Sequence, residues 1–123
     1  MAVNWLSNIS RYGSVSIYHS NLTFNTVSSE SLSEAYRVRV GIDDGMVILE
    51  PLSKERVLRG DIDEHTLFEI KRKSSYSRIS STGLVNNLLS ALKLELKSEP
   101  LKLKTIWDAE RNCLIINAKE EEK

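Results

Sequence analysis

The most constraining feature of the sequence is a pair of alternating apolar runs joined by Asp43-Asp44-Gly45. Every second position is apolar in residues 38–42 and again in residues 47–49. A period of two places these side chains on one face of an extended strand. Asp-Gly between two such runs favours a tight hairpin, because a type I′ turn needs positive φ at both central positions. The sequence therefore predicts an antiparallel hairpin that must bury one face against another element.

The hairpin ends a longer passage, residues 14–51. Two short alternating stretches, one with Val15 and Ile17 and one with Leu22 and Phe24, precede a Ser-rich segment at residues 28–35. This order indicates strand, turn, strand and helix, with Ser28 or Ser29 as the helix cap. The first passage is expected to be a ββαββ unit.

Residues 66–118 show the same order with insertions. Two strands are expected around a turn at residues 73–75, followed by a helix in STGLVNNLLSALKLEL whose leucines and Val85 follow the 3, 4, 7, 8 spacing of one face. Ser81 or Thr82 is the expected cap. After Pro100, alternation resumes and predicts a second hairpin with its turn at residues 108–112.

Neither passage can bury its hairpins alone, which predicts that the two pack together as an internal duplication. We expect an α+β, mainly β fold in which two ββαββ units form a small pseudo-dimeric barrel, of the swapped-hairpin or of the double-psi type. The expected division is an N-terminal arm 1–13, a first repeat 14–51, a polar linker 52–65 with a turn at Arg59-Gly60-Asp61, a second repeat 66–118 and a charged tail 119–123.

Composition excludes several classes. The chain has 123 residues, 41% apolar and 28% charged, which is typical of a soluble globular domain. One cysteine, Cys113, excludes an intrachain disulfide and favours a reducing cytoplasm. No apolar run approaches the roughly 18 residues that span a bilayer, so no membrane association is expected. His19 and His65 are isolated, and no nucleophile motif, metal-ligand cluster or glycine-rich loop is present; no enzyme activity, cofactor or metal is expected.

Charge is unevenly distributed although the formal net charge is zero. Residues 14–51 hold two basic and five acidic residues, whereas residues 66–118 hold nine basic and five acidic ones. Local positive charge attracts phosphates and releases their counterions. The candidate nucleic-acid-binding residues lie in one stretch: Lys71, Arg72, Lys73, Tyr76 and Arg78. The alternative is a solvated edge strand, because charged edges prevent aggregation.

The segment LTFNTVSSESLSEAYRVRVGIDDGMVILEP resembles the AbrB/MazE/MraZ-like group of swapped-hairpin DNA-binding domains. The resemblance rests on a short strand, a capped short helix and a hairpin whose arms are Val38-Arg39-Val40 and Ile48-Leu49-Glu50; residues 66–118 resemble it more loosely. This sequence has Phe24-Asn25 and Ile79-Ser80 where family members usually have Ile-Pro. The resemblance implies two tandem diverged copies.

Two functions follow as hypotheses. The resemblance implies a small DNA-binding transcription regulator or antitoxin-like protein, a homo-oligomer that contacts the phosphates of double-stranded DNA through the basic hairpin. The alternative is a non-enzymatic protein-interaction or scaffold module, with Trp5 as one candidate for docking a protein partner.

Overall fold

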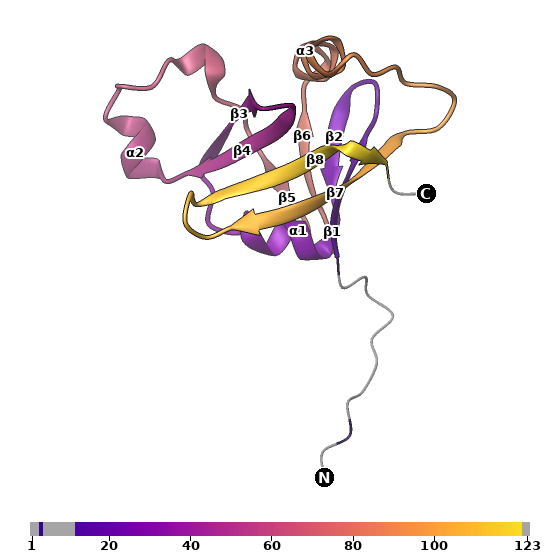
Figure 1. Ribbon diagram of the computed structural model, residues 1–123. Coiled ribbons are helices and arrows are strands. Elements are labelled where there is room, and N and C mark those ends of the chain that lie inside the picture. Colours follow the sequence, from indigo (N-terminus) through magenta and orange to yellow (C-terminus); the bar gives the residue numbers. More distant parts are fainter. Residues whose placement is uncertain (1–2, 4–11, 122–123) are drawn as a thin grey trace.

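The computed structural model describes residue 3 and residues 12–121, so Trp5 lies outside the described residues. The elements follow the order β-β-α-β-β twice, with a linker between the two sets (Figure 1). The first set is β1 (Gly13–Ile17), β2 (Asn21–Phe24), α1 (Thr26–Ser31), β3 (Arg37–Asp43) and β4 (Met46–Leu52). The second is β5 (Lys71–Arg72), β6 (Ser77–Ser80), α3 (Thr82–Leu92), β7 (Leu101–Asp108) and β8 (Cys113–Glu121).

The eight strands form one antiparallel sheet in the order β3-β4-β8-β7-β1-β2-β6-β5. The sheet curls into a half-barrel, and a single bridge joins its two edges. At this bridge Val38 in β3 and Phe68, just before β5, exchange backbone hydrogen bonds of 3.0 and 2.8 Å. The expected α+β, mainly β class is confirmed, and the predicted hairpin at residues 38–49 is the β3–β4 pair, with φ of 52° at Asp44 and 75° at Gly45.

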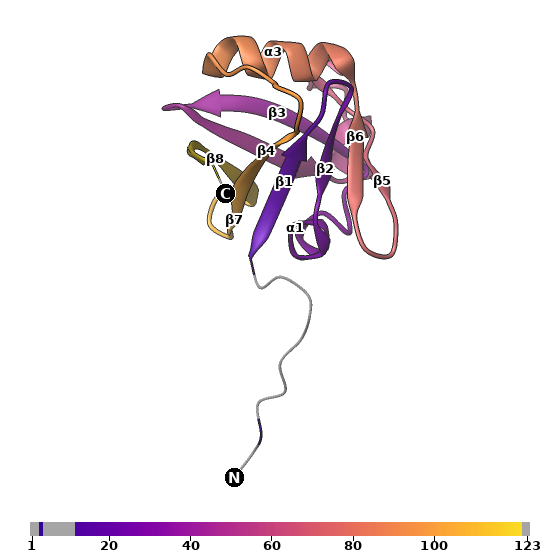
Figure 2. The ribbon, with the colours of Figure 1, turned by 90° about the vertical axis from the view of Figure 1, so that its right-hand side faces the viewer.

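One continuous core fills the inside of the curled sheet. α1 lies at one end of the half-barrel and α3 at the other (Figure 2). α3 buries Leu84, Val85 and Leu88, and Ser81 caps it by accepting a hydrogen bond from the Leu84 N–H, as the sequence predicts. The inward strand positions of the core are Val15, Ile17, Leu22, Phe24, Val38, Val47, Leu49, Ile79, Leu103, Leu114 and Ile116. On the opposite face of β1, β2 and β6, Arg78 and Ser80 are exposed and Ser14 is buried. Ser16, Asn21 and Thr23 are half-buried there.

Two details differ from the expectations. Asn25, and not Ser28 or Ser29, caps α1, since its Oδ1 accepts from the N–H groups of Ser28 and Ser14 at 3.1 Å each. Ser28 is buried instead, and its hydroxyl lies 2.6 Å from that of Thr105 in β7. The cap prediction was wrong because it weighed residue type alone and not the tertiary partner.

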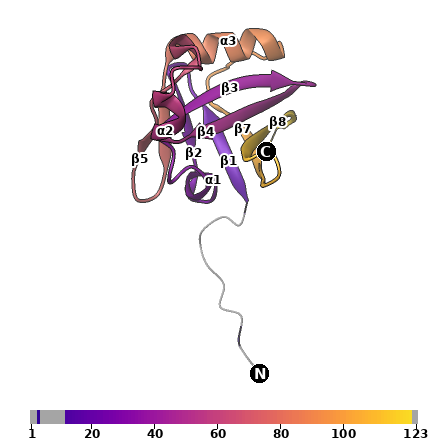
Figure 3. The same cartoon turned by 90° about the vertical axis from the view of Figure 1, so that its left-hand side faces the viewer.

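The linker is also more ordered than a polar loop. It contains α2 (Lys54–Leu58), capped by Ser53, and the 3-10 helix η1 (Glu64–Thr66), capped by Asp63. Both lie on the side of β3 and β4, opposite to β1 and β2 in Figure 1, and Figure 3 looks at this side directly. In addition, β8 continues through Glu121, into the segment expected as a charged tail. Among the described helices, none combines the length and apolar content needed to cross a membrane.

Candidate nucleic-acid interface

The basic hairpin predicted from the sequence is β5–β6, and its side chains divide between two faces. Lys71 is paired with Arg78, and the Lys73 N–H donates to the Tyr76 carbonyl at 2.8 Å. Paired residues in an antiparallel hairpin share a face. Lys71, Lys73, Tyr76 and Arg78 therefore lie together on the outer face of the sheet.

Arg72 does not join them. It is paired with Ser77, which is fully buried, so its side chain starts from the opposite face. Its guanidinium Nη1 donates to the Ala35 carbonyl at 2.8 Å. The structure places Arg72 as a tether between the hairpin and the segment after α1, apart from the other four predicted residues.

The strand register extends the outer cations into a row across five strands. Lys102 in β7 is paired with Ser16 in β1, Ser16 with Thr23 in β2, Thr23 with Arg78 in β6, and Arg78 with Lys71 in β5. Four spacings of about 4.8 Å give a row of roughly 19 Å along the sheet. It carries cations at both ends and hydroxyl groups in the middle, a composition suited to an extended chain of phosphates.

Aromatic rings flank this row, which we call the basic row. The Arg78 guanidinium lies over the Tyr76 ring, 5.3 Å from its centroid, and its Nε donates to Thr23 Oγ1 at 3.4 Å. On the other side, Lys104, two residues beyond Lys102 and on the same face, has its Nζ 5.6 Å from the Tyr12 ring centroid. These contacts hold the cations over rings without neutralising them.

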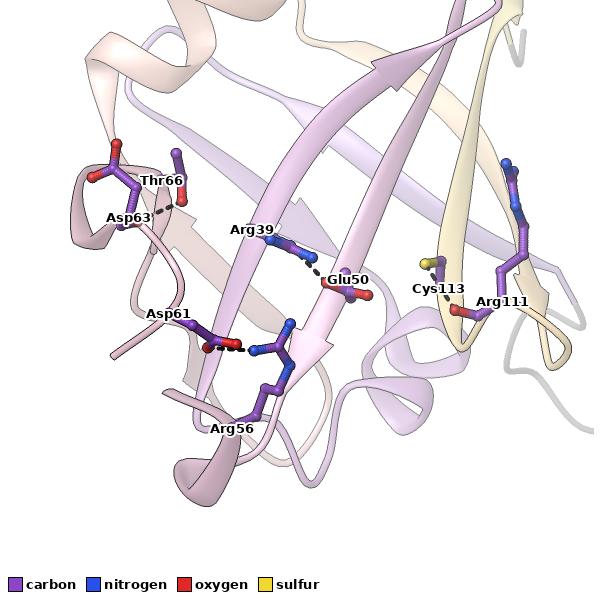
Figure 4. A network of polar contacts seen from close by, with 8 residues as sticks. All are labelled: Arg39, Glu50, Arg56, Asp61, Asp63, Thr66, Arg111 and Cys113. Atoms are coloured by element: carbon purple, nitrogen blue, oxygen red, sulfur yellow. Dashed lines mark hydrogen bonds and ion pairs between the residues drawn. The ribbon is translucent and has the colours of Figure 1, made fainter. Parts of the chain in front are cut away.

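The outer positions of β1, β2, β5 and β6, and of β7 up to Lys104, hold no Asp or Glu in the described structure. The nearest carboxylate in the sequence to β5 is Glu69, which lies 3.7 Å from Arg37. The other ion pairs found among the described residues lie on other surfaces: Arg39–Glu50 and Arg56–Asp61 (Figure 4) and Arg111–Asp43. The basic row itself therefore contains no carboxylate, while Glu69 lines the same hollow as Lys71 and Arg78 at one end, and β8 pairs with β7 through Glu121 and Leu103 at the other.

Sequence reasoning missed Lys102 and Lys104. Their alternation in LKLKT already places both on one face of a strand. What the sequence does not provide is the pairing of β7 with β1, a contact between residues about 90 positions apart, which brings them to the hairpin. The relevant signal was the excess of basic residues throughout residues 66–118.

The other reactive side chains of the described residues lie apart from one another. His19, between β1 and β2, and His65, in η1, are both exposed and lie in separate parts of the fold. Cys113 is buried and its Sγ donates to the Arg111 carbonyl at 3.2 Å (Figure 4); burial raises the pKa of the Cys113 thiol, which makes it a poor nucleophile. Within the described residues, no three His, Cys, Asp or Glu side chains gather closely enough to hold a metal ion.

Comparison with models of protein families, with curated proteins and with solved structures gives no match for this chain.

Proposed function

We propose that this chain binds nucleic acid through the outer face of β7-β1-β2-β6-β5. The observation that carries the proposal is the basic row, which runs without a carboxylate from Lys102 to Lys71. Phosphate binding depends on local charge, so the zero net charge of the whole chain does not oppose it. Within this class, the resemblance to AbrB-like domains supports a small transcription regulator or antitoxin-like protein.

The face supplies a definite number of phosphate contacts. Five cations lie on it: Lys71, Lys73, Arg78, Lys102 and Lys104. Each neutralised phosphate contributes about −0.9 to the slope of log K against log salt for duplex DNA and about −0.7 for a single strand. Five contacts therefore predict a slope of about −3.5 to −4.5. Non-specific binding of this kind has a Kd of roughly 10⁻⁴ to 10⁻⁶ M at physiological salt.

We also propose that the half-barrel is an internal duplication with interleaved units. Replacing each strand of the first set by the corresponding strand of the second, and the reverse, gives the same strand order. The match holds when the Val38–Phe68 bridge is counted as the counterpart of the β1–β7 pairing. In both cases the first strand of one unit pairs with the third strand of the other. Such interleaving supports the swapped-hairpin form of the fold.

The register between the units is consistent with the same proposal, as any antiparallel pairing of two equivalent strands is. Thr23 is paired with Arg78 and Ile48 with Ile115, and around each of these pairs the flanking pairs exchange under a two-fold rotation. The flanking pairs are Leu22–Ile79 with Phe24–Ser77, and Val47–Ile116 with Leu49–Leu114. The first of these two-fold positions falls at the centre of the outer face, so the basic row crosses the boundary between the units.

Fluorescence anisotropy of labelled 16-residue oligonucleotides, single-stranded and duplex, at 50 and 200 mM salt tests the proposal. Lys71→Ala/Arg78→Ala removes two cations of the basic row, and Lys54→Ala/Arg59→Ala removes two exposed cations from the α2 region as a matched control. We expect wild type and control to bind with a steep salt dependence, and the first variant to lose a slope of about 1.4 to 1.8. Equal losses in both variants would refute the site.

The alternative, a protein-interaction module without nucleic-acid binding, gives a different result in the same titration. It predicts no change of anisotropy with any oligonucleotide, even at 50 mM salt. It also predicts that retention on heparin is absent in the wild type. Either result would indicate that the basic row is only a solvated surface of the sheet.

A further inference from the structure

We infer that the outer face takes a single strand of nucleic acid with unstacked bases, and not the duplex that the AbrB-like resemblance implies; this inference rests on the nucleic-acid binding of the proposed function. Its starting point is the set of three tyrosines around the basic row. Tyr76 lies under Arg78, Tyr12 is 67% exposed beside Lys104, and Tyr18 is 42% exposed. Aromatic rings stack on bases only where those bases are splayed out of a helix.

Tyr18 belongs to the same face as the other two. Its N–H donates to the Asn21 carbonyl at 2.9 Å, which continues the β1–β2 pairing by one residue beyond Ile17. Alternation then places Tyr18 on the face of Ser16, opposite to the buried Ile17. The three rings therefore surround the row on the same surface as its cations, the combination of charge and stacking groups that proteins use for single strands.

Among the described residues, the face has no element that enters a duplex groove. Reading of the major groove needs a helix or a projecting two-stranded ribbon. α1 and α3 lie at the ends of the half-barrel (Figure 2) and not on the outer face of its strands. The β5–β6 hairpin is tied down at both its sides, because Arg72 donates to the Ala35 carbonyl and Thr26 Oγ1 donates to the Ser75 carbonyl, each at 2.8 Å.

Short polar side chains occupy the middle of the face. Ser16 and Thr23 lie in the basic row. Asn21 and Ser80 are paired beside it, two residues along β2 and β6 from Thr23 and Arg78. Such groups allow a sugar–phosphate backbone to approach the sheet closely and offer neutral hydrogen bonds to phosphates and base edges. At the Tyr18 end, both Lys97 and Glu99 line a hollow beside the ring, so the positive charge there is balanced by a carboxylate. The favoured path therefore follows the row and the side of Tyr12 and Tyr76.

The test uses the full chain and three fluorescein-labelled 16-residue probes: oligo-dT, oligo-U and a mixed-sequence duplex DNA, at 50 and 200 mM salt. Tyr76→Leu removes the ring and retains an apolar side chain, and Tyr12→Leu is the second variant in case the first does not fold. Tyr36→Leu is the matched control, because Arg37 lies over Tyr36 at 4.3 Å in the same kind of pair, away from the basic row.

We expect wild type to bind a single-stranded probe at least about 10-fold more tightly than duplex, and each of the first two variants to lose about 10-fold in that affinity with an unchanged salt slope. Tyr36→Leu should bind as wild type does. Comparison of oligo-U with oligo-dT distinguishes RNA from DNA as the source of the strand, since the two differ in the 2′-OH and in the methyl group of thymine.

Two outcomes overturn the inference, and they separate it from the proposed function. If duplex binds as tightly as the single strands, or if folded Tyr76→Leu and Tyr12→Leu bind as wild type, the single-strand inference is wrong while salt-dependent binding still supports the proposed function. If wild type binds none of the probes at 50 mM salt, both are wrong.

Discussion

The contact between Gly13, Ser28 and Thr105 predicts that Gly13→Ala strongly destabilises the fold. Gly13 begins β1 and is paired with Thr105 in β7. A Cβ added at Gly13 would lie 2.3 Å from Thr105 Oγ1 and 2.7 Å from Ser28 Oγ, both well inside van der Waals contact. These two hydroxyls form a buried hydrogen bond of 2.6 Å that attaches α1 to the end of the half-barrel. The missing side chain of Gly13 therefore makes room for this bond.

The expected cost has two parts. Overpacking of a closely packed site costs about 1–3 kcal/mol. Separating the two hydroxyls leaves at least one of them without its partner in a site where Ser28 is 1% and Thr105 is 7% exposed, at a cost of about 1–3 kcal/mol. Because the side chains share the displacement, we expect a loss of about 2–4 kcal/mol, or roughly 8–16 °C in Tm for a domain of this size.

Urea unfolding followed by tryptophan fluorescence measures this loss, and Thr105→Ala provides the control. Thr105→Ala removes the closest oxygen, so Gly13→Ala should cost less in the Thr105→Ala background than in wild type, by at least about 1 kcal/mol of coupling. A Gly13→Ala variant within about 0.5 kcal/mol of wild type, or strictly additive effects of the two substitutions, would refute this account of the contact.

Three further predictions follow from single residues. Arg72→Ala should lower the free energy of unfolding by about 1–3 kcal/mol, because the Ala35 carbonyl loses its charged hydrogen-bond donor. The same variant should leave the salt slope of oligonucleotide binding unchanged in anisotropy titrations. Asn25→Ala should cost about 1–2 kcal/mol in urea unfolding, through loss of the α1 cap. Burial raises the pKa of the Cys113 thiol in the folded protein. The protonated thiol therefore contributes its full stabilisation below the unfolded pKa of about 8.5, and this contribution is lost as pH rises through the folded pKa. Cys113→Ala should flatten the fall in the free energy of unfolding measured between pH 8 and about 10.

Local chemistry made much of the fold predictable. Asp44-Gly45 could be assigned to a hairpin turn because few residues tolerate two consecutive positive φ angles, and the structure has them there. The α3 helix was predictable from the spacing of its leucines and from Ser81, whose side chain has no competing partner in the structure. In both cases the deciding interactions lie within a few residues of each other.

Predictions were wrong or incomplete where a contact with a residue far along the chain determines the position of a side chain. Ser28 has the right side chain for a cap, but its hydroxyl bonds to Thr105, 77 positions away. Arg72 looks equivalent to Lys71 and Arg78 in the sequence, and only the pairing with Ser77 shows that it starts from the other face. Lys102 and Lys104 reach the basic row through β7–β1 pairing, which no local pattern contains.

The single bridge between Val38 and Phe68 determines where the half-barrel opens first. All the other neighbouring strands are held by two or more paired positions, whereas this junction has one. Local opening follows the smallest set of interactions, so the amide protons of Val38 and Phe68 should exchange with solvent faster than those of β1 and β2. β3 and β5 are the edge strands of the sheet, and each such opening removes the one bridge between their edges, which leaves a longer template for adding a strand from another molecule. We therefore expect any aggregation of the folded protein to begin at this junction.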